Sequence, residues 1–394
     1  MFTPGWDPSS FQAAQRGVRM NRLSMEVSFE GADRLSCSAN VGYTTARGST
    51  LFLLNPQLQL EGTQLDGQEV LASRSGLVVS LPDSAGHHQL QVRYAGSIPS
   101  DGGLGVFGSS FDLNGNVLWT PTFSWGGRLR VEMSIDVPSG VEVLFPRGGG
   151  GPERTVPSSS SIDATTVGGR VRSHCDGGGI RVDSLVREDC RALHRTVERV
   201  LAWQEQNWGP QPFGALSLVE TWRQKAGAYA RAGLISTPDW TTLTSEELSQ
   251  RLVHETTHQW WGMGVLPGED WFSEDWLSEG LATYCEFCWL REKGGPGTAD
   301  RFLTEATRTV TGLQGSLSTI SLLSQEGWSL TRYGGLLTLL ELEHRIPDLR
   351  NRLREFRARH DGTFVTTEAL AHELSPEVPE AWLTEHLVRS RTWP

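Results

Sequence analysis

Two histidines and a glutamate near the middle of the chain constrain its fold more than any other feature. His254, Glu255 and His258 form the pattern H-E-x-x-H. On a helix, the two histidines lie one turn apart on the same face, with roughly 5–6 Å between their Cβ atoms. Two imidazoles at that separation can bind one metal ion, and the glutamate lies near the metal without needing to bind it. The pattern therefore predicts a helix that carries part of a catalytic metal site.

A carboxylate further along the chain can complete this site. Glu279 lies in the segment WLSEGLATY, where Leu277 and Leu281 have the i, i+4 spacing of a second helix. Two histidines, one glutamate and a water molecule form a known ligand set of catalytic zinc. We therefore expect one zinc ion bound by His254, His258 and Glu279, with a fourth position left for water.

Local signals favour a helix around the motif. Thr244 and Glu247 have the spacing of a capping box, a pattern that starts helices. Trp260 and Trp261 follow the second histidine and can pack the helix and exclude water from a pocket. The alternative is a pair of histidines on a solvated helix face. The helix start, the aromatic pair and the later carboxylate together favour the metal site.

The two segments resemble the gluzincin aminopeptidases, the family of alanyl aminopeptidase and leukotriene hydrolase. HETTHQWWG corresponds to H-E-x-x-H-Q-W-[FW]-G in that family, and DWLSEGLATY corresponds to W-L-N-E-G-[FL]-A-[ST]-Y. The spacer between them is longer than usual, and we place the extra residues in the loop at Pro267 and Gly268. The resemblance implies a zinc metallopeptidase in which Glu255 takes a proton from the attacking water.

The chain departs from the family at the segment GAYARAGL, which spans residues 227–234. The family has G-[AG]-M-E-N-x-G-L on an edge strand, and its glutamate binds the free α-amine of the substrate. Ala230 stands at the glutamate position and cannot accept a hydrogen bond, while the neighbouring Arg231 would repel an ammonium group. The strand backbone can still pair with an extended peptide. By the resemblance, the substrate-binding residues of this strand are Gly227, Ala228, Tyr229, Ala230 and Arg231.

Three functional interpretations follow from this departure. The first is a zinc peptidase whose specificity is not strictly N-terminal. The second is a true aminopeptidase in which another acid, such as Glu220 or Glu274, binds the amine. The third is a non-catalytic scaffold that binds a peptide or a partner, but an inert scaffold does not need Glu255 as a base.

A second departure concerns the family's Y-x-K-G motif, whose tyrosine hydroxyl stabilises the oxyanion. The matching segment here is LTRYGG, residues 330–335. If Gly335 matches the glycine of the motif, Arg332 falls at the tyrosine position and Tyr333 lies one place later. We expect Tyr333 to be the catalytic residue and Arg332 to bind a substrate carbonyl.

The hydrophobic period changes near residue 187. Before it, short alternating runs such as MEVSFE and LRVEMSIDVP, separated by Gly, Pro, Asn, Asp and Ser, predict strands. After it, Leu193, Val197 and Val200 recur at helical spacing. Residues 147–161 are rich in Gly, Ser and Pro, and we expect a mobile loop there.

The predicted fold class is α+β. We expect a flexible arm over residues 1–20 and a mostly antiparallel β domain, a saddle or sandwich, over 21–186. A thermolysin-like zinc-peptidase catalytic domain is expected over 187–394. The family's large helical C-terminal domain would begin about where this chain ends, so the resemblance implies a short two-domain member.

Charge and cysteine content narrow the expected partners and location. The net charge is -11 at pH 7, so nucleic acid and anionic membranes are poor partners, and we expect a peptide substrate. Neither a membrane span nor a signal peptide is evident. The five cysteines are few and odd in number, which argues against a disulfide framework and for a cytoplasmic location. Cys285 and Cys288 form a C-x-x-C that we interpret as small buried residues rather than a redox pair.

Overall fold

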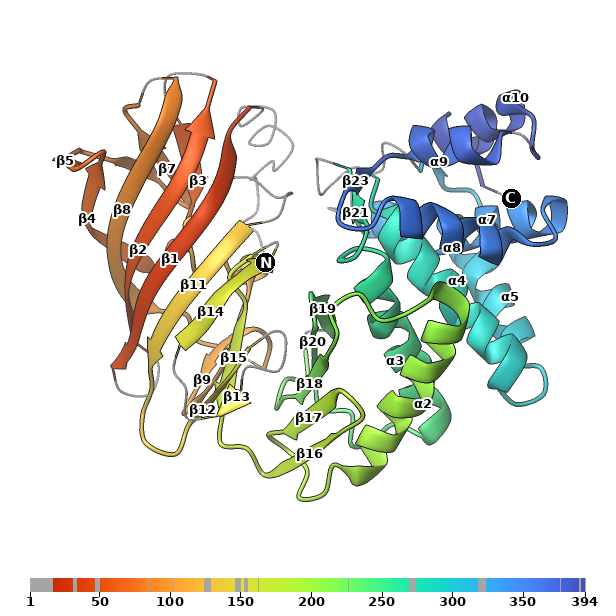
Figure 1. Cartoon of the computed structure of the whole chain (residues 1–394), viewed down its shortest axis with the longest axis horizontal. Helices are drawn as coiled ribbons and strands as arrows, with labels where there is room; N and C mark the ends of the chain where they lie inside the picture. Colours follow the sequence, from red (N-terminus) through yellow and green to blue (C-terminus); the bar gives the residue numbers. More distant parts are fainter. Residues whose placement is uncertain are drawn as a thin grey trace. The chain divides into compact units, whose positions relative to one another are not determined.

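The computed structural model describes residues 17–30, 34–46, 50–83, 85–100, 102–123, 129–145, 150–151, 155–161, 163–225, 227–268, 274–317, 324–375, 377–389 and 391–393. The chain divides into two compact units. In Figure 1 the strands β1 to β20 run from red to green, and the helices from α2 (Arg191–Trp208) onward run from green to blue. The first unit is made of Met1–Gly177, Arg181–Cys190 and Leu216–Asp239, and the second of Gly178–Ile180, Arg191–Ala215 and Trp240–Pro394.

The first unit is built on a seven-stranded sheet with the strand order β14-β11-β1-β2-β8-β4-β5. Neighbouring strands are antiparallel, except that β1 and β11 are parallel. Leu23, Met25 and Val27 alternate along β1 and are buried, as the two-residue period of a strand requires for a sheet with one face on a core. The strands are β1 (Arg19–Glu30), β2 (Arg34–Thr45), β4 (Leu58–Leu65), β5 (Gln68–Glu69), β8 (Gly86–Ser97), β11 (Leu129–Asp136) and β14 (Thr155–Ser161).

Two smaller sheets belong to the same unit, one five-stranded with the order β13-β12-β15-β10-β9 and one three-stranded with the order β3-β7-β6. Phe52, Trp119 and Phe123 are fully buried in its core. The elements are β3 (Thr50–Leu53), β6 (Ser73–Ser75), β7 (Val78–Leu81), β9 (Gly105–Phe107), β10 (Ser110–Leu113), the 3₁₀ turn η1 (Gly115–Val117), β12 (Glu142–Leu144), β13 (Gly150–Gly151) and β15 (Thr166–Gly169).

A further five-stranded sheet of the first unit carries the strand where the sequence departs from the family. Its order is β16-β17-β18-β20-β19, so β19 lies at the edge. The strands are β16 (Ser173–Gly177), β17 (Ile180–Ser184), β18 (Leu216–Glu220), β19 (Tyr229–Arg231) and β20 (Leu234–Thr237). The boundary between the compact units therefore does not fall at residue 187 alone. Leu216–Asp239, which contains β18, β19 and β20, belongs to the first unit with the other β sheets. The domain ranges given above stay predictions.

The second unit is helical and is organised around α4 (Trp276–Lys293). This helix packs against α3, α5 and α7, and almost every residue from Trp276 to Leu290 is buried, as expected for a core helix. The other elements are α2 (Arg191–Trp208), α3 (Ser245–Trp260), β21 (Leu266–Pro267), α5 (Thr298–Val310), β22 (Gln314–Gly315), α6 (Gln325–Ser329), the π-helical turn η3 (Leu330–Gly334), α7 (Gly335–Arg345), α8 (Leu349–Arg359), β23 (Phe364–Val365), α9 (Thr367–Leu374), α10 (Glu380–Leu383), the π-helical turn η4 (Thr384–Val388) and β24 (Arg391–Thr392).

Two expectations about irregular segments need correction. Strand β1 begins at Arg19, so residues 19 and 20 are not part of a flexible arm, and residues 1–16 lie outside the described residues. Strands β13 and β14 lie inside the expected loop 147–161, because each pairs with a neighbouring strand, β12 or β11. The rest of that loop, 147–149 and 152–154, lies outside the described residues.

The cysteines also differ from expectation. Cys175 in β16 and Cys190, just before α2, form a disulfide, with 6.1 Å between their Cα atoms. The fold brings the two residues together from 15 positions apart, a proximity that the cysteine count could not reveal. Cys285 and Cys288 are free and buried, which confirms their interpretation as core residues. No helix in the described part of the chain is long and apolar enough to cross a membrane.

Candidate functional site

The helix that carries both histidines starts and is held as its sequence predicts. The backbone N–H of Glu247 donates to Thr244 Oγ1 at 3.3 Å, and that of Thr244 donates to the Glu247 carboxylate at 2.9 Å. This capping box satisfies N–H groups that have no partner within the helix. From α2, the amide of Gln204 donates to Val253 O at 2.9 Å and to Thr257 Oγ1 at 2.7 Å. These contacts hold α3 against α2 through the residues that precede each histidine.

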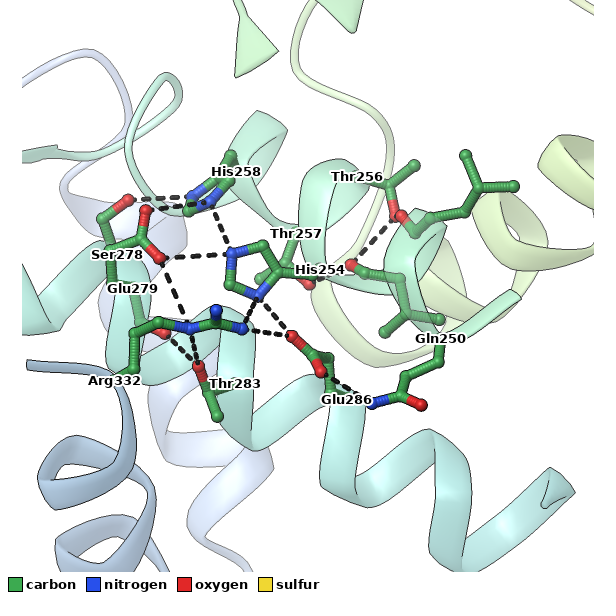
Figure 2. Close-up of polar contacts among 12 residues, drawn as sticks. Gln250, His254, Thr256, Thr257, His258, Ser278, Glu279, Thr283, Glu286 and Arg332 are labelled. Atoms are coloured by element: carbon green, nitrogen blue, oxygen red, sulfur yellow. Dashed lines mark hydrogen bonds and ion pairs between the residues drawn. The ribbon is translucent and has the colours of Figure 1, made fainter. Parts of the chain in front are cut away.

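Two helices bring the three predicted metal ligands together (Figure 2). The Nε2 atoms of His254 and His258 on α3 lie 3.3 Å apart. The Glu279 carboxylate on α4 lies 3.2 Å from His254 Nε2 and 3.5 Å from His258 Nε2. The ligand atoms of all three residues lie within 4.8 Å of one another. This convergence is what a single metal ion needs.

The hydrogen bonds behind the histidines indicate which nitrogen of each ring is free. Ser278 Oγ donates to Trp261 O at 3.1 Å, so it accepts from His258 Nδ1 at 2.9 Å. His254 Nδ1 lies 2.5 Å from Glu286 Oε1, and a carboxylate can only accept. Both rings therefore carry their proton on Nδ1 and direct the Nε2 lone pair inward.

Three acceptors consequently face one point with no donor among them. Neutral imidazole nitrogens and a carboxylate in this arrangement are stabilised only by a cation or by an added proton. Burial and Arg332 lower the pKa of His254, but the carboxylates of Glu286 and Glu279 outweigh them and raise it to about 9. The site attracts positive charge, and its donor set of two nitrogens and one carboxylate fits zinc.

Glu286 and Ser278 were not predicted from the sequence. Glu286 accepts from His254 through one oxygen and from Gln250 Nε2 at 3.1 Å through the other. Partners of this kind fix the orientation of metal-binding histidines. The signal was present, because Glu286 follows Glu279 by two helical turns and so lies on the same face of α4.

Glu255, the predicted base, is half-buried and belongs to the same electrostatic environment. Burial raises its pKa to about 7, with the carboxylates of Glu279 and Glu286 adding to the effect and His254 and Arg332 opposing it. A carboxylate with a pKa in this range is suited to accept a proton near neutral pH and to release it again.

Arg332 and Tyr333 are neighbours on the turn η3, but their side chains contact different parts of the second unit. The Arg332 guanidinium reaches the metal-binding cluster, where Nη2 donates to Glu286 Oε1 at 2.9 Å and Nε lies 3.9 Å from Glu279 Oε2. The Tyr333 ring instead contacts the rings of Phe302 and Trp328, with 6.4 and 6.5 Å between centroids. In the described part of the chain, Tyr333 has no contact with the histidines or with Glu279.

The strand β19 offers less to a substrate than the resemblance implies. Ala230 is buried, and the Arg231 guanidinium bonds both oxygens of Asp163, at 2.9 and 2.6 Å, as well as Ala230 O at 2.8 Å. The Tyr229 hydroxyl donates to Asp112 at 2.5 Å. Gly227 is exposed and Ala228 is half-buried. The polar side chains of the strand thus bind partners within the first unit.

The two acids considered as replacements for the missing glutamate are also bonded within the protein. Glu220 is fully buried and accepts from Ser184 Oγ at 2.8 Å and from Arg187 Nε at 2.7 Å. Glu274 accepts from the Thr367 backbone N–H at 2.7 Å and from its hydroxyl. Neither carboxylate is left without donors.

Comparisons with known proteins support the fold. No protein-family model matches the sequence, and a search of curated proteins finds no match. Among solved structures, the M1 zinc metallopeptidase of Deinococcus radiodurans is 18% identical with a TM-score of 0.69, covering 96% of this chain and 95% of that chain. A mutant of that enzyme bound to the substrate Tyr-Ser-Ala has a TM-score of 0.68 at 17% identity, covering 94% of each chain. Yeast LTA4 hydrolase has a TM-score of 0.74 at 12% identity, covering 100% of this chain and 71% of that chain.

These similarities confirm the predicted fold class, α+β with an N-terminal β region followed by a metallopeptidase-like region. A TM-score near 0.7 over almost the whole chain means that the fold is shared. At such low identity the similarity concerns the fold, and the chemistry of this chain has to be argued from its own residues.

Proposed function

We propose that this chain is a zinc-dependent metallopeptidase that hydrolyses peptide bonds, with His254, His258 and Glu279 as the zinc ligands. The observation that carries the proposal is the convergence of three acceptor groups, of which the two histidines are already bonded through their outer nitrogens to Ser278 and Glu286. Solved structures of the same fold are M1 zinc metallopeptidases, one of them with a tripeptide substrate bound.

The chemistry divides between the metal and one carboxylate. Zinc bound at these ligands would supply a Lewis acid that lowers the pKa of a bound water toward about 7. Glu255, adjacent to the first ligand, takes a proton from the water that attacks the peptide carbonyl and passes it to the leaving nitrogen. Its raised pKa, about 7, suits both transfers.

We propose that cleavage is not restricted to the N-terminal residue. Ala230 offers no acceptor for a free amine, and Arg231 is paired with Asp163. Glu220 and Glu274, the other acids considered, accept hydrogen bonds from residues of the protein itself. A true aminopeptidase with relocated amine recognition and a non-catalytic scaffold are the alternatives that the test below separates.

The cytoplasmic location stays a prediction, and the disulfide bond in the first unit argues against it. Disulfides persist in oxidising compartments and are rare in the reducing cytosol. The Cys175–Cys190 bond therefore favours an oxidising compartment. A peptide substrate, and the absence of nucleic-acid or membrane partners expected from the net charge of -11, are likewise proposals.

The test is a metal analysis of the purified chain combined with digestion of one peptide in two forms, free and N-acetylated. We expect one zinc per chain, cleavage of both forms, and loss of cleavage after chelation that added zinc restores. Cleavage of the free form alone would indicate a true aminopeptidase. Bound zinc without cleavage of any peptide in a library would indicate a scaffold, and the absence of zinc binding would overturn the proposal.

A further inference from the structure

A close contact between two glycines brings the positively charged Arg332 next to the predicted metal ligands. A Cβ built on Gly280, the neighbour of Glu279, would lie 3.0 Å from Gly335 Cα and 3.1 Å from Thr331 O. A Cβ built on Gly335 would lie 2.8 Å from Gly280 Cα. Only glycine permits this approach of α4 to η3 and α7. The approach sets how near Arg332 lies to Glu279.

The turn that carries Arg332 has an unusual geometry. Residues Leu330–Gly334 form a π-helical turn between α6 and α7. A π turn holds one residue more than an α turn, and such turns occur frequently at functional sites. The extra residue rotates the side chains that follow. Within this turn, the Arg332 guanidinium faces the metal-binding cluster.

Arg332 and His254 share a single oxygen atom. Glu286 Oε1 lies 2.5 Å from His254 Nδ1 and accepts from Arg332 Nη2 at 2.9 Å. Arg332 Nε donates to Thr283 Oγ1 at 3.3 Å, so the guanidinium spans two side chains of α4. Figure 2 shows the guanidinium on the Glu286 side of His254, while Nε2 of that ring faces His258 and Glu279.

Aromatic rings hold the guanidinium from its other side. Its central carbon lies 4.7 Å from the centroid of Trp328 and 5.6 Å from that of Tyr333, distances typical of cation–π contacts. The Arg332 side chain is 16% exposed, whereas Trp328 is 37% exposed. The guanidinium is therefore confined between two rings and the carboxylate that orients a metal ligand.

We infer that Arg332 is a positioning residue of the metal site: it fixes Glu286, which in turn fixes His254 for metal binding. This inference rests on the proposed function. The expectation that Arg332 binds a substrate carbonyl stays a prediction, and the experiment below separates the two roles. Tyr333 contributes its ring as part of the support for Arg332.

The physical reason lies in the shared oxygen. A carboxylate bonded only to His254 and Gln250 keeps an uncompensated negative charge in a buried place and can rotate. Arg332 compensates that charge, and its planar fork restricts the rotation. Loss of a partner that orients a metal ligand typically lowers metal affinity about 10- to 100-fold.

The experiment measures the zinc dissociation constant of full-length variants by competition with a chromophoric chelator. Arg332→Met should weaken zinc binding about 10- to 100-fold. Arg332→Lys should also weaken it, because a lysine cannot bond Glu286 and Thr283 together. The matched control is Arg291→Met. Arg291 ties α4 to Glu343 of α7 at 2.8 and 3.2 Å without touching the cluster, so its loss should leave zinc affinity unchanged.

Turnover of the zinc-saturated variants separates the alternatives. A positioning role predicts that added zinc restores much of the turnover of Arg332→Lys. A role in binding the substrate carbonyl predicts unchanged zinc affinity with turnover that zinc cannot restore, and this result would overturn the inference. Equal loss of zinc affinity in Arg291→Met would also overturn it, because a general weakening of helix packing would then explain the effect. Wild-type protein that binds no zinc would instead overturn the proposed function.

Discussion

The two units each bury a cluster of charges, and the clusters differ in how completely their acids are paired. In the first unit, Asp112 lies 3.2 Å from the Arg223 guanidinium, both side chains being fully buried, and accepts from Ser236 Oγ at 2.7 Å. Asp163 is held by both Arg231 contacts. Every carboxylate of this cluster has a guanidinium partner.

The cluster of the second unit is organised in the opposite way. The inward atoms of His254, His258 and Glu279 are acceptors that face each other, while the outer nitrogens of the two histidines are bonded to Ser278 and Glu286. A cluster with all charges paired stabilises the fold but has nothing left to offer a ligand. A cluster held from outside and left with acceptors inside can bind a cation. The difference separates a structural cluster from a candidate metal site more clearly than burial or charge count does.

The largest expected effect is a loss of turnover without a loss of metal, which would distinguish a catalytic base from a metal ligand in the second cluster. Glu255→Gln removes the base but none of the ligands, so we expect turnover to fall about 10²- to 10⁴-fold with one zinc still bound. The measurement is kcat/KM on an N-acetylated peptide, together with metal analysis of the same sample.

Glu246→Gln is the matched control for this variant. Glu246 lies on the same helix but is exposed at its first turn, so its loss should leave turnover unchanged. If Glu255→Gln retained wild-type turnover, the assignment of Glu255 as the base would be wrong.

Loss of Arg231 breaks the paired cluster of the first unit. Arg231→Met leaves the Asp163 carboxylate without its cation, which should destabilise the first unit by about 3–5 kcal/mol. Hydrogen exchange of β10 and β15 measures this loss, and zinc affinity should not change. An equal loss of zinc affinity would contradict the assignment of the paired cluster to a structural role.

The pH dependence of this loss tests its cause. Burial raises the pKa of Asp163, but the pairing with Arg231 and the hydrogen bonds from Thr165 and Gly115 outweigh burial and lower it. In the wild type this group therefore stabilises the fold above its unfolded pKa of about 3.9, and the contribution is lost as the pH falls through the folded pKa. In Arg231→Met, protonation removes the unpaired charge. The difference between variant and wild type should hence shrink as the pH falls toward about 4.

The parts of the metal site that could be predicted from the sequence are those set by local spacing. The H-E-x-x-H helix and its capping box depend on residues within one or two turns, and both formed as predicted. The two helices with their ligands were predictable for the same reason. The spacing of Glu286 from Glu279 places both on one face of α4, but Glu286 lies between Cys285 and Cys288 in an apolar segment typical of a core.

What could not be predicted depends on contacts between distant segments. The Cys175–Cys190 bond follows from the adjacency of β16 and the start of α2. Strands β13 and β14 form in a Gly- and Ser-rich stretch because β12 and β11 offer them open edges. Arg332 was readable at the tyrosine position from the alignment of Gly335, but its pairing with Glu286 depends on the contact of the turn Leu330–Gly334 with α4.

The smallest expected effect is that of removing the Tyr333 hydroxyl. It decides whether Tyr333 acts on the substrate or only supports Arg332 beside the metal-binding cluster. Tyr333→Phe removes the hydroxyl and keeps the ring that contacts Phe302, Trp328 and Arg332. Loss of a hydroxyl that stabilises the oxyanion typically costs about 10²- to 10³-fold in kcat. From the contacts of the ring we expect kcat to change less than about threefold, since a phenylalanine ring can make the same cation–π contact with Arg332.

Tyr333→Ala should behave differently, because without the ring Arg332 loses part of its support and zinc affinity should fall. A large loss of kcat in Tyr333→Phe at unchanged zinc affinity would instead mean that Tyr333 acts on the substrate, as the family's tyrosine does.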